Sequence, residues 1–305
     1  MKKIFAIVLA AVMASVLCVT AFAASHAQTK IKVGAYLINE DFESGELNTE
    51  VLKAWGGYKI EGGKIHLGHS NNWVESSPEF HTVAAFSNYY ATFKIAGAIR
   101  DCYYGFALRA PEGEHGSLMN GGRFGVPSAA EVSTGIAIDL YGAANSTLGD
   151  QVGVTFCNGG ANGDAPAFTV ARPEGFGDGS EASFDVIDLG SVITILINKK
   201  ELVTIELSGL ANGVYTKATA YDPTGAELGT FDVSVLEAGS IVFYQRNNYI
   251  TVDDFTVASA EADNGQEDPG EQPGENPGSG DAAIIAIAAV GCIALAGVAV
   301  AKKVR

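Results

Sequence analysis

Short segments in which hydrophobic and polar residues alternate fill the middle of this 305-residue chain. Successive side chains of a β-strand point to opposite faces, so this alternation predicts strands that are buried on one face. β-branched and aromatic residues are frequent in these segments, and turn sequences such as Asn198-Lys199-Lys200 and Asp222-Pro223-Thr224-Gly225 separate them. The strands that the pattern predicts most clearly are 89–95, 102–109, 134–141, 151–157, 191–198, 201–208, 214–221, 241–245 and 249–257.

The region between residues 30 and 260 has no convincing segment of helical period. Without helices to connect parallel strands, the strands are expected to form antiparallel sheets that pack face to face. We therefore predict one all-β domain over residues 24–260. Within it, the strand at 191–198 is apolar on both faces, which predicts a central position with both faces covered.

The strand at 251–257 is predicted to be half solvated, with Val252 and Phe255 on opposite faces because the alternation has a period of two. Its sequence Asp253-Asp254-Phe255 resembles Glu40-Asp41-Phe42 near the start of the domain. We therefore expect the first and last strands to lie side by side.

The N-terminus has the features of an export signal. Lys2 and Lys3 precede an uncharged apolar run at residues 4–19, and Ala21-Phe22-Ala23 supplies the small residues that a signal peptidase requires. We predict a helical, cleaved signal peptide at residues 1–23, with an uncleaved N-terminal anchor as the alternative.

The C-terminus has the features of a membrane anchor. Residues 282–301 carry no charge, and as a helix they would span roughly 30 Å, the thickness of the hydrocarbon layer. The basic residues of the tail at 302–305 predict a cytoplasmic end, so the domain should lie outside the cell. Residues 261–281 are rich in Pro, Gly and acids, which predicts an extended stalk between domain and membrane.

This order of stalk, short motif, apolar span and basic tail resembles the cell-wall sorting signal of Gram-positive surface proteins. In that family a sortase cleaves a motif of the form Leu-Pro-any-Thr-Gly, or a variant that begins Asn-Pro. The matching residues are Asn276, Pro277, Gly278, Ser279 and Gly280, which would be cut between Ser279 and Gly280. Asn276 and Ser279 differ from the commoner Leu and Thr. Covalent attachment by a sortase and simple membrane anchoring both remain open, and both display the domain at the cell surface.

The domain itself resembles the concanavalin A-like superfamily of jelly-roll β-sandwiches. The resemblance rests on the opening at 39–45, Trp55, the strand and turn at 193–200, and the closing segments 243–248 and 252–257. The superfamily includes laminin-G-like modules, lectins, glucanases and domains named after 3-keto-disaccharide hydrolase. The resemblance implies a sandwich of two antiparallel sheets, and it supports the fold far better than a function.

A catalytic signature is not found in the sequence. Retaining glucanases of this superfamily carry two glutamates and an aspartate on one strand, in the pattern Glu-any-Asp-any-any-Glu or a shorter form. The nearest acidic clusters are at 40–43, 112–114 and 185–188, and the acids of the last cluster fall on opposite faces of a strand. We interpret these acids as solvated, and we expect no catalytic residue.

Sugar binding needs flat apolar surfaces beside planar hydrogen-bonding side chains. The predicted ligand-binding residues are Trp73, Tyr103, Arg109, Arg123, Arg246 and Asn247. The further aromatic candidates, whose ordinary role would be core packing, are Tyr89, Tyr90, Tyr104 and Tyr244. Strand alternation places Tyr103 and Arg109 on the same face.

Cofactors and covalent links are weakly indicated. The spacing of histidines and cysteines predicts no metal site, although Asp139, Asp164 and Asp178 could serve as calcium ligands. Cys102 and Cys157 could form a disulfide or remain buried thiols. The net charge of −16 argues against a nucleic-acid partner.

The resulting hypothesis is a surface-anchored, extracellular and non-catalytic module that binds carbohydrate or another envelope or host ligand. The alternatives are a hydrolase or lyase that acts on glycans, and a purely structural spacer. A cluster of acids in a cleft would favour the enzyme, and exposed aromatic residues without acids would favour binding.

Overall fold

The computed structural model describes residues 30–55, 57–68, 79–97, 103–111, 134–141, 151–156, 166–173, 179–245 and 249–263. The predicted signal peptide, most of the stalk, the sorting motif, the apolar segment at 282–301 and the basic tail all lie outside these residues. Within the described ranges, no helix has the length and apolarity needed to cross a membrane.

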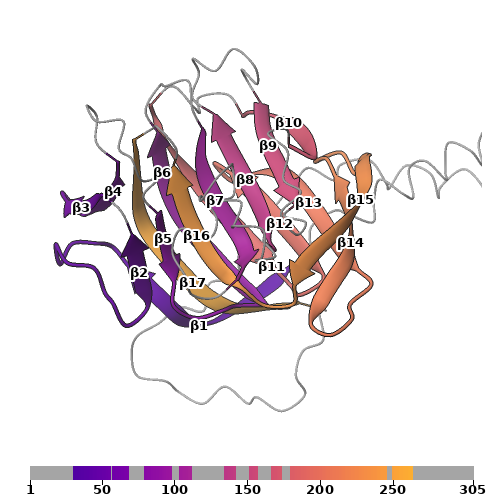
Figure 1. Ribbon diagram of the computed structural model, residues 1–305, viewed down its shortest axis with the longest axis horizontal. Coiled ribbons are helices and arrows are strands. Elements are labelled where there is room, and N and C mark those ends of the chain that lie inside the picture. The colour runs from indigo at the N-terminus through magenta and orange to yellow at the C-terminus, as the bar shows by residue number, and fades with distance from the viewer. Residues whose placement is uncertain are drawn as a thin grey trace, which may run out of the picture.

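Two antiparallel sheets make up the described part of the chain (Figure 1). The ten-stranded sheet has the order β15 (Glu227–Leu236), β14 (Val214–Tyr221), β13 (Lys200–Ser208), β12 (Val192–Ile197), β11 (Glu181–Asp188), β6 (Tyr89–Gly97), β17 (Ile250–Ala262), β4 (Lys64–Leu67), β3 (Tyr58–Glu61), and β1 (Ile31–Glu40) also pairs with β17. The seven-stranded sheet has the order β10 (Phe168–Ala171), β9 (Gln151–Phe156), β8 (Ile136–Tyr141), β7 (Tyr103–Ala110), β16 (Ser240–Gln245), β5 (Glu79–Thr82), β2 (Leu52–Trp55).

All of the clearly predicted strands are confirmed, because the period of two is a direct consequence of strand geometry. Most of their ends agree to within about two residues. β17 is the exception, since it ends at Ala262 and not at residue 257. The predicted all-β sandwich of two antiparallel sheets is likewise confirmed.

The core lies between the two sheets and is rich in phenylalanine. Phe80 and Phe243 from the seven-stranded sheet stack with ring centroids 4.5 Å apart. Phe93 of the ten-stranded sheet stacks on Phe184 at 5.3 Å and meets Phe243 edge-on at 4.8 Å. Aromatic pairs of this geometry add about 0.5–1.5 kcal/mol each beyond the burial of their area. This cluster therefore joins the two sheets at the centre of the sandwich.

The first and last strands are neighbours, as the repeated sequence predicted. β1 pairs with β17, and Glu40 lies opposite Phe255. The amide of Asp263 donates a hydrogen bond to the carbonyl of Lys30, with the two atoms 2.6 Å apart. The chain therefore enters and leaves the domain at the same place, which is the C-terminal end of β17 (Figure 1).

The predicted alternation within β17 is wrong. Val252 and Phe255 are both buried in the core, although they are three positions apart and strict alternation would put them on opposite faces. The pairing with β6 shifts register between Asp253 and Thr256, and Asp254 has a φ of 48° and is exposed. A β-bulge at this point inserts an extra residue, so the residues that follow turn to the other face.

β12 is central, as predicted, because it pairs with β11 and β13. Its two faces are unequal: Ile193, Ile195 and Ile197 lie in the main core, whereas Val192 and Thr194 on the other face are half-buried. The prediction that both faces are covered is therefore confirmed for the face toward the core. The outer face is only partly covered.

Candidate ligand-binding face

The outer face of the seven-stranded sheet carries buried polar side chains. Phe80, Ile138 and Phe243 point into the main core, so their strand neighbours point to the opposite face. We define the polar sheet face by five such buried residues, which are Glu79, His81, Asp139, Thr155 and Tyr244. Buried polar groups of this density on the outside of a sandwich require an explanation, because burying them without partners is costly.

The register of the strands aligns part of this face into a row. Glu79 lies opposite Tyr244, Tyr244 opposite Gly105, and Gly105 opposite Asp139. Asp139 in turn lies opposite Gly153. Neighbouring strands are about 4.8 Å apart, so the Cα atoms of Glu79 and Asp139 are separated by about 14 Å.

Asp139 is the best-defined group of the row. The Tyr244 hydroxyl donates a hydrogen bond to Asp139 Oδ1 at 2.9 Å, and the Thr155 hydroxyl donates one to Oδ2 at 3.2 Å. The Tyr244 hydroxyl also lies 3.3 Å from the carbonyl oxygen of Ile138. Asp139 is 0% exposed. Its carboxylate is thus oriented by two neutral hydroxyl groups.

Glycines make this arrangement possible. A Cβ atom on Gly105 would lie 1.9 Å from the carbonyl oxygen of Ile138 and 3.1 Å from the Tyr244 hydroxyl. A Cβ atom on Gly153 would lie 3.4 Å from that of Asp139. The Tyr244 side chain therefore crosses over Gly105 to reach Asp139.

Two strands of the seven-stranded sheet have neighbouring ends. β5 begins at Glu79, directly after segment 69–78 with Trp73, and β16 ends at Gln245, directly before Arg246 and Asn247. These two strand ends are neighbours because Tyr244 pairs with Glu79. We call this place the Glu79 end.

Tyr103 also belongs to the Glu79 end, because it is the first residue of β7 and pairs with Tyr141. At the opposite end of these strands, β7 ends at Ala110 and β8 begins at Ile136, which pairs with Leu108. Trp73, Arg123, Arg246 and Asn247 themselves lie outside the described residues.

Arg109 lies in the interior, not on the face where the alternation places it. A register shift in the pairing of β7 with β16 accompanies a φ of 56° at Arg109, and this bulge turns the side chain between the sheets. Its Nε and Nη2 atoms donate to the two carboxylate oxygens of Asp188, both at 2.6 Å. The guanidinium also donates to the carbonyls of Leu236 at 3.0 Å and Gly190 at 2.9 Å. Arg109 thereby ties β7 to β11 of the other sheet.

The interpretation of the 185–188 cluster as solvated acids is wrong, although its acids do fall on opposite faces. Asp188 is fully buried between the sheets, where burial raises the pKa of its carboxyl and the Arg109 guanidinium opposes that rise. Asp185 is buried on the other face, where it accepts hydrogen bonds from the Tyr90 hydroxyl at 2.5 Å and from Lys199 Nζ at 2.7 Å. Burial and this contact with Asp185 raise the pKa of Tyr90.

The remaining predicted residues divide between described and undescribed parts of the chain. Of the calcium candidates, Asp139 belongs to the polar sheet face, whereas Asp164 and Asp178 lie outside the described residues, as do Cys102 and Cys157. Within the described ranges, no group of three His, Cys, Asp or Glu side chains could hold a metal ion. Tyr89, Tyr90 and Tyr104 are buried, with Tyr89 and Tyr104 in the main core and Tyr90 in a separate cluster.

Glu79, His81 and Thr155 are residues of this face that the sequence did not predict. Their common signal is a polar residue at an outward position of a short strand, next to core residues such as Phe80 and Val154. That signal becomes informative when register shows that the outward positions lie on one face.

Comparisons with known proteins give the fold. No family model matches the chain, and no curated protein matches it. A protein of unknown function with a galectin-like fold from Bacillus subtilis has 16% sequence identity and a TM-score of 0.51, over 76% of this chain and 100% of that one. The chain has a concanavalin A-like, galectin-like jelly-roll fold.

Two further solved structures are glycan-active proteins with lower structural similarity. A structure reported with endo-acting O-glycanases of human gut microbiota has 14% identity and a TM-score of 0.47, over 74% of this chain and 99% of that one. The catalytic domain of an endo-1,3-β-glucanase from Thermotoga petrophila has 9% identity and a TM-score of 0.46, over 76% of this chain and 100% of that one.

Proposed function

We propose that this protein is a surface-displayed, non-catalytic module that binds carbohydrate at the Glu79 end of the polar sheet face. The observation that carries the proposal is the row in which Glu79, Tyr244 and Asp139 stand in register on one sheet face. The three side chains are buried, so in this proposal they hold the strand ends at the Glu79 end in fixed positions for the ligand.

The side chain between the two acids supports binding over hydrolysis. In glycosidases the two carboxyl groups flank the scissile bond, about 5–5.5 Å apart in retaining enzymes and about 6.5–9.5 Å apart in inverting ones. Here the Tyr244 side chain, which starts on β16 and reaches Asp139, occupies the space between Glu79 and Asp139. A hydrolase or lyase is the second candidate, favoured by the presence of two buried carboxylic acids on one face.

The proposal includes anchoring through the C-terminal segments. A signal peptide at 1–23, a stalk at 261–281, a span at 282–301 and a cytoplasmic tail at 302–305 would leave the sandwich outside the cell. The geometry of β17 is compatible with this arrangement, because its thirteen residues extend about 40 Å from the Glu79 end to the place where the chain leaves. A tether at Ala262 would leave the Glu79 end free.

Glycan binding tests the first part of the proposal. The purified full-length protein should bind a subset of neutral oligosaccharides on an array and release no reducing sugar from them. Asp139→Asn should weaken that binding at least about tenfold, since it removes a hydrogen-bonded charge. Asp185→Asn is the matched control, because Asp185 is equally buried but lies on the other sheet.

The outcomes separate the three hypotheses. Release of reducing sugar that disappears in Glu79→Gln would replace the binding module with a hydrolase. Absence of both binding and release across the array would favour the spacer.

Protease treatment of intact cells tests the location. Protease added outside should remove the sandwich under conditions that leave cytoplasmic proteins intact. Deletion of residues 276–280 should move the protein from the wall fraction to the membrane fraction if a sortase attaches it. An unchanged distribution would leave simple membrane anchoring as the mechanism, and a sandwich protected in intact cells would contradict surface display.

A further inference from the structure

β1 forms an exposed edge of the ten-stranded sheet. Its only partner among the described strands is β17, so the backbone groups of its other edge have no strand partner within the described residues. The strand is ten residues long. Long edge strands are usually shortened, charged or covered, because their free N–H and C=O groups pair readily with another strand.

Exposed apolar side chains gather at this edge. Tyr36 is 67% exposed and Leu37 is 47% exposed, both on β1. Tyr58, the next exposed large hydrophobic residue along the chain, lies on β3 at the same border of the sheet. Three of the five large exposed hydrophobic residues in the described part of the chain thus lie on two strands. Such concentration is typical of an interaction surface.

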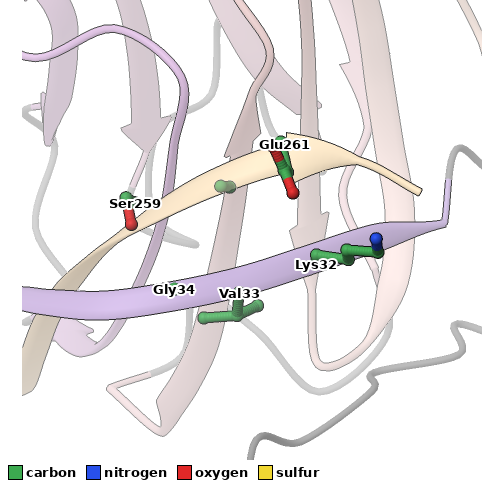
Figure 2. A pocket seen from close by; sticks show the side chains of 6 residues that line it. Lys32, Val33, Gly34, Ser259 and Glu261 are labelled. Carbon is green, nitrogen blue, oxygen red and sulfur yellow. The ribbon is translucent and has the colours of Figure 1, made fainter. Parts of the chain in front are cut away.

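A shallow hollow lies beside the same strand. It has a volume of about 310 Å³ and is lined from β1 by Lys32, Val33 and Gly34, and from β17 by Ser259, Ala260 and Glu261 (Figure 2). A Cβ atom on Gly34 would lie 2.4 Å from the Ser259 hydroxyl oxygen, so a larger residue would displace that side chain. The Ser259 hydroxyl therefore lies directly over Gly34 and bounds the hollow on that side.

We propose that the free edge of β1 pairs antiparallel with β1 of a second copy of this chain, about a two-fold axis through Tyr36. The sequence of the strand is self-complementary about that residue. Lys32 would face Glu40 of the second copy, and the small residues Gly34 and Ala35 would face the larger Ile38 and Leu37. Tyr36 would meet its own counterpart on the axis.

The charge of the strand favours this occupant. The whole chain carries −16, which opposes self-association over most of its surface. β1 contains only Lys32 and Glu40 as charged residues, so the edge itself is neutral. A two-fold arrangement places opposite charges together twice, as isologous interfaces require.

Cysteine crosslinking tests the pairing in the full-length protein. A residue on a two-fold axis meets itself, so Tyr36→Cys should form an intermolecular disulfide under mild oxidation. Leu210→Cys is the matched control, because Leu210 is 45% exposed but lies between β13 and β14. The high local concentration at a formed interface should make the Tyr36→Cys dimer appear at least about tenfold faster than the Leu210→Cys dimer.

Light scattering provides a second measurement without an introduced thiol. The wild-type protein should show a concentration-dependent dimer that Lys32→Glu abolishes, since the introduced carboxylate would then face the Glu40 carboxylate of the second copy. Dimers formed through the C-terminal apolar segment would persist in this variant, and that result would count against β1.

Equal crosslinking rates at positions 36 and 210 would overturn the proposal. They would mean that the register shifts within β1, between Val33 and Tyr36 and between Tyr36 and Ile38, protect the edge from pairing. Crosslinking of Tyr36→Cys to a different extracellular protein would also overturn it, because the edge would then receive a foreign strand.

Discussion

Asp139 and Asp188 are both fully buried carboxylates, but they lie in different regions and have different partners. Asp188 lies between the sheets, where the Arg109 guanidinium binds both of its oxygens. Asp139 lies on the outer face of one sheet, where the hydroxyls of Tyr244 and Thr155 orient its oxygens. The first pair joins two layers of the fold, whereas the second group lies within a single layer.

This difference separates structure from recognition. A carboxylate held bidentately by arginine has its strongest acceptor directions occupied, so it stabilises the sandwich and offers little to a ligand. The Asp139 carboxylate is oriented by neutral hydroxyls of its own sheet, so it does not join the two sheets. The polar sheet face is therefore the better candidate for ligand binding, and the inter-sheet pair is the better candidate for stability.

The largest expected effect is on the inter-sheet pair. Arg109→Met removes the guanidinium and leaves the Asp188 carboxylate buried without its partner, which should lower the free energy of unfolding by about 3–5 kcal/mol. Urea denaturation followed by fluorescence measures the change. The double variant Arg109→Met/Asp188→Leu should recover most of the loss, because no buried charge remains. A loss below about 1 kcal/mol in the single variant would contradict a stabilising role.

A smaller effect is expected on the polar sheet face. Asp139→Ala leaves the hydroxyls of Tyr244 and Thr155 without their acceptor, which should lower the free energy of unfolding by about 1–3 kcal/mol. The same urea experiment applies. A loss as large as that of Arg109→Met would mean that Asp139 stabilises the fold as strongly as the Arg109–Asp188 pair does. The contrast between the two acids would then fail.

Alkaline pH should reveal another buried acid, Asp185, through its partner Tyr90. The pKa of Tyr90 is raised in the folded protein, so the unfolded chain loses this proton first and folding stability declines as the pH rises above about 10. The contribution is present in full below that pH. The slope from this group is at most about 1.4 kcal/mol per pH unit, and Tyr90→Phe should remove it in denaturation curves measured between about pH 9 and pH 11. An identical slope in both proteins would show that Tyr90 ionises equally well in the folded state.

The smallest effect is expected on the solvated face of the ten-stranded sheet. Lys94 and Asp254 form an ion pair at 2.5 Å, and their side chains are 39% and 52% exposed. Lys94→Ala should change the free energy of unfolding by less than about 0.5 kcal/mol, and the change should shrink further at high salt. A larger loss that does not depend on salt would mean that the Lys94–Asp254 pair stabilises the fold as a buried ion pair does.

The sequence predicts the strands and the pairing of β1 with β17 because both depend on local pattern. Alternation follows from the geometry of a single strand, and the repeated acidic-aromatic sequence at residues 40–42 and 253–255 marks two strands with similar positions. Neither inference needs knowledge of what lies across the core.

The sequence does not predict where bulges interrupt that alternation. Arg109 turns inward and Phe255 keeps the side of Val252 because the strand register shifts beside each of them. A bulge depends on the register of two strands distant in sequence, and here it is accompanied by positive φ at Arg109 and Asp254. Arginine gives no turn signal, and aspartate tolerates positive φ but does not by itself mark a bulge.

The candidate site is also non-local. Asp139 and Tyr244 are 105 residues apart, and their contact depends on Gly105 of a third strand. Asp139 was predicted for calcium and Tyr244 for sugar stacking, each from its residue type alone. Only the sheet register brings the two predictions to one place.

The position of β17 has a mechanical consequence. A ligand held at the Glu79 end and an attachment beyond Ala262 would pull the sandwich along the direction of this strand. β17 is flanked by β6 on one side and by β1 and β4 on the other, so the force would load many ladder hydrogen bonds at once instead of peeling them singly. The strand through which the chain leaves the domain is thus well placed to carry tension.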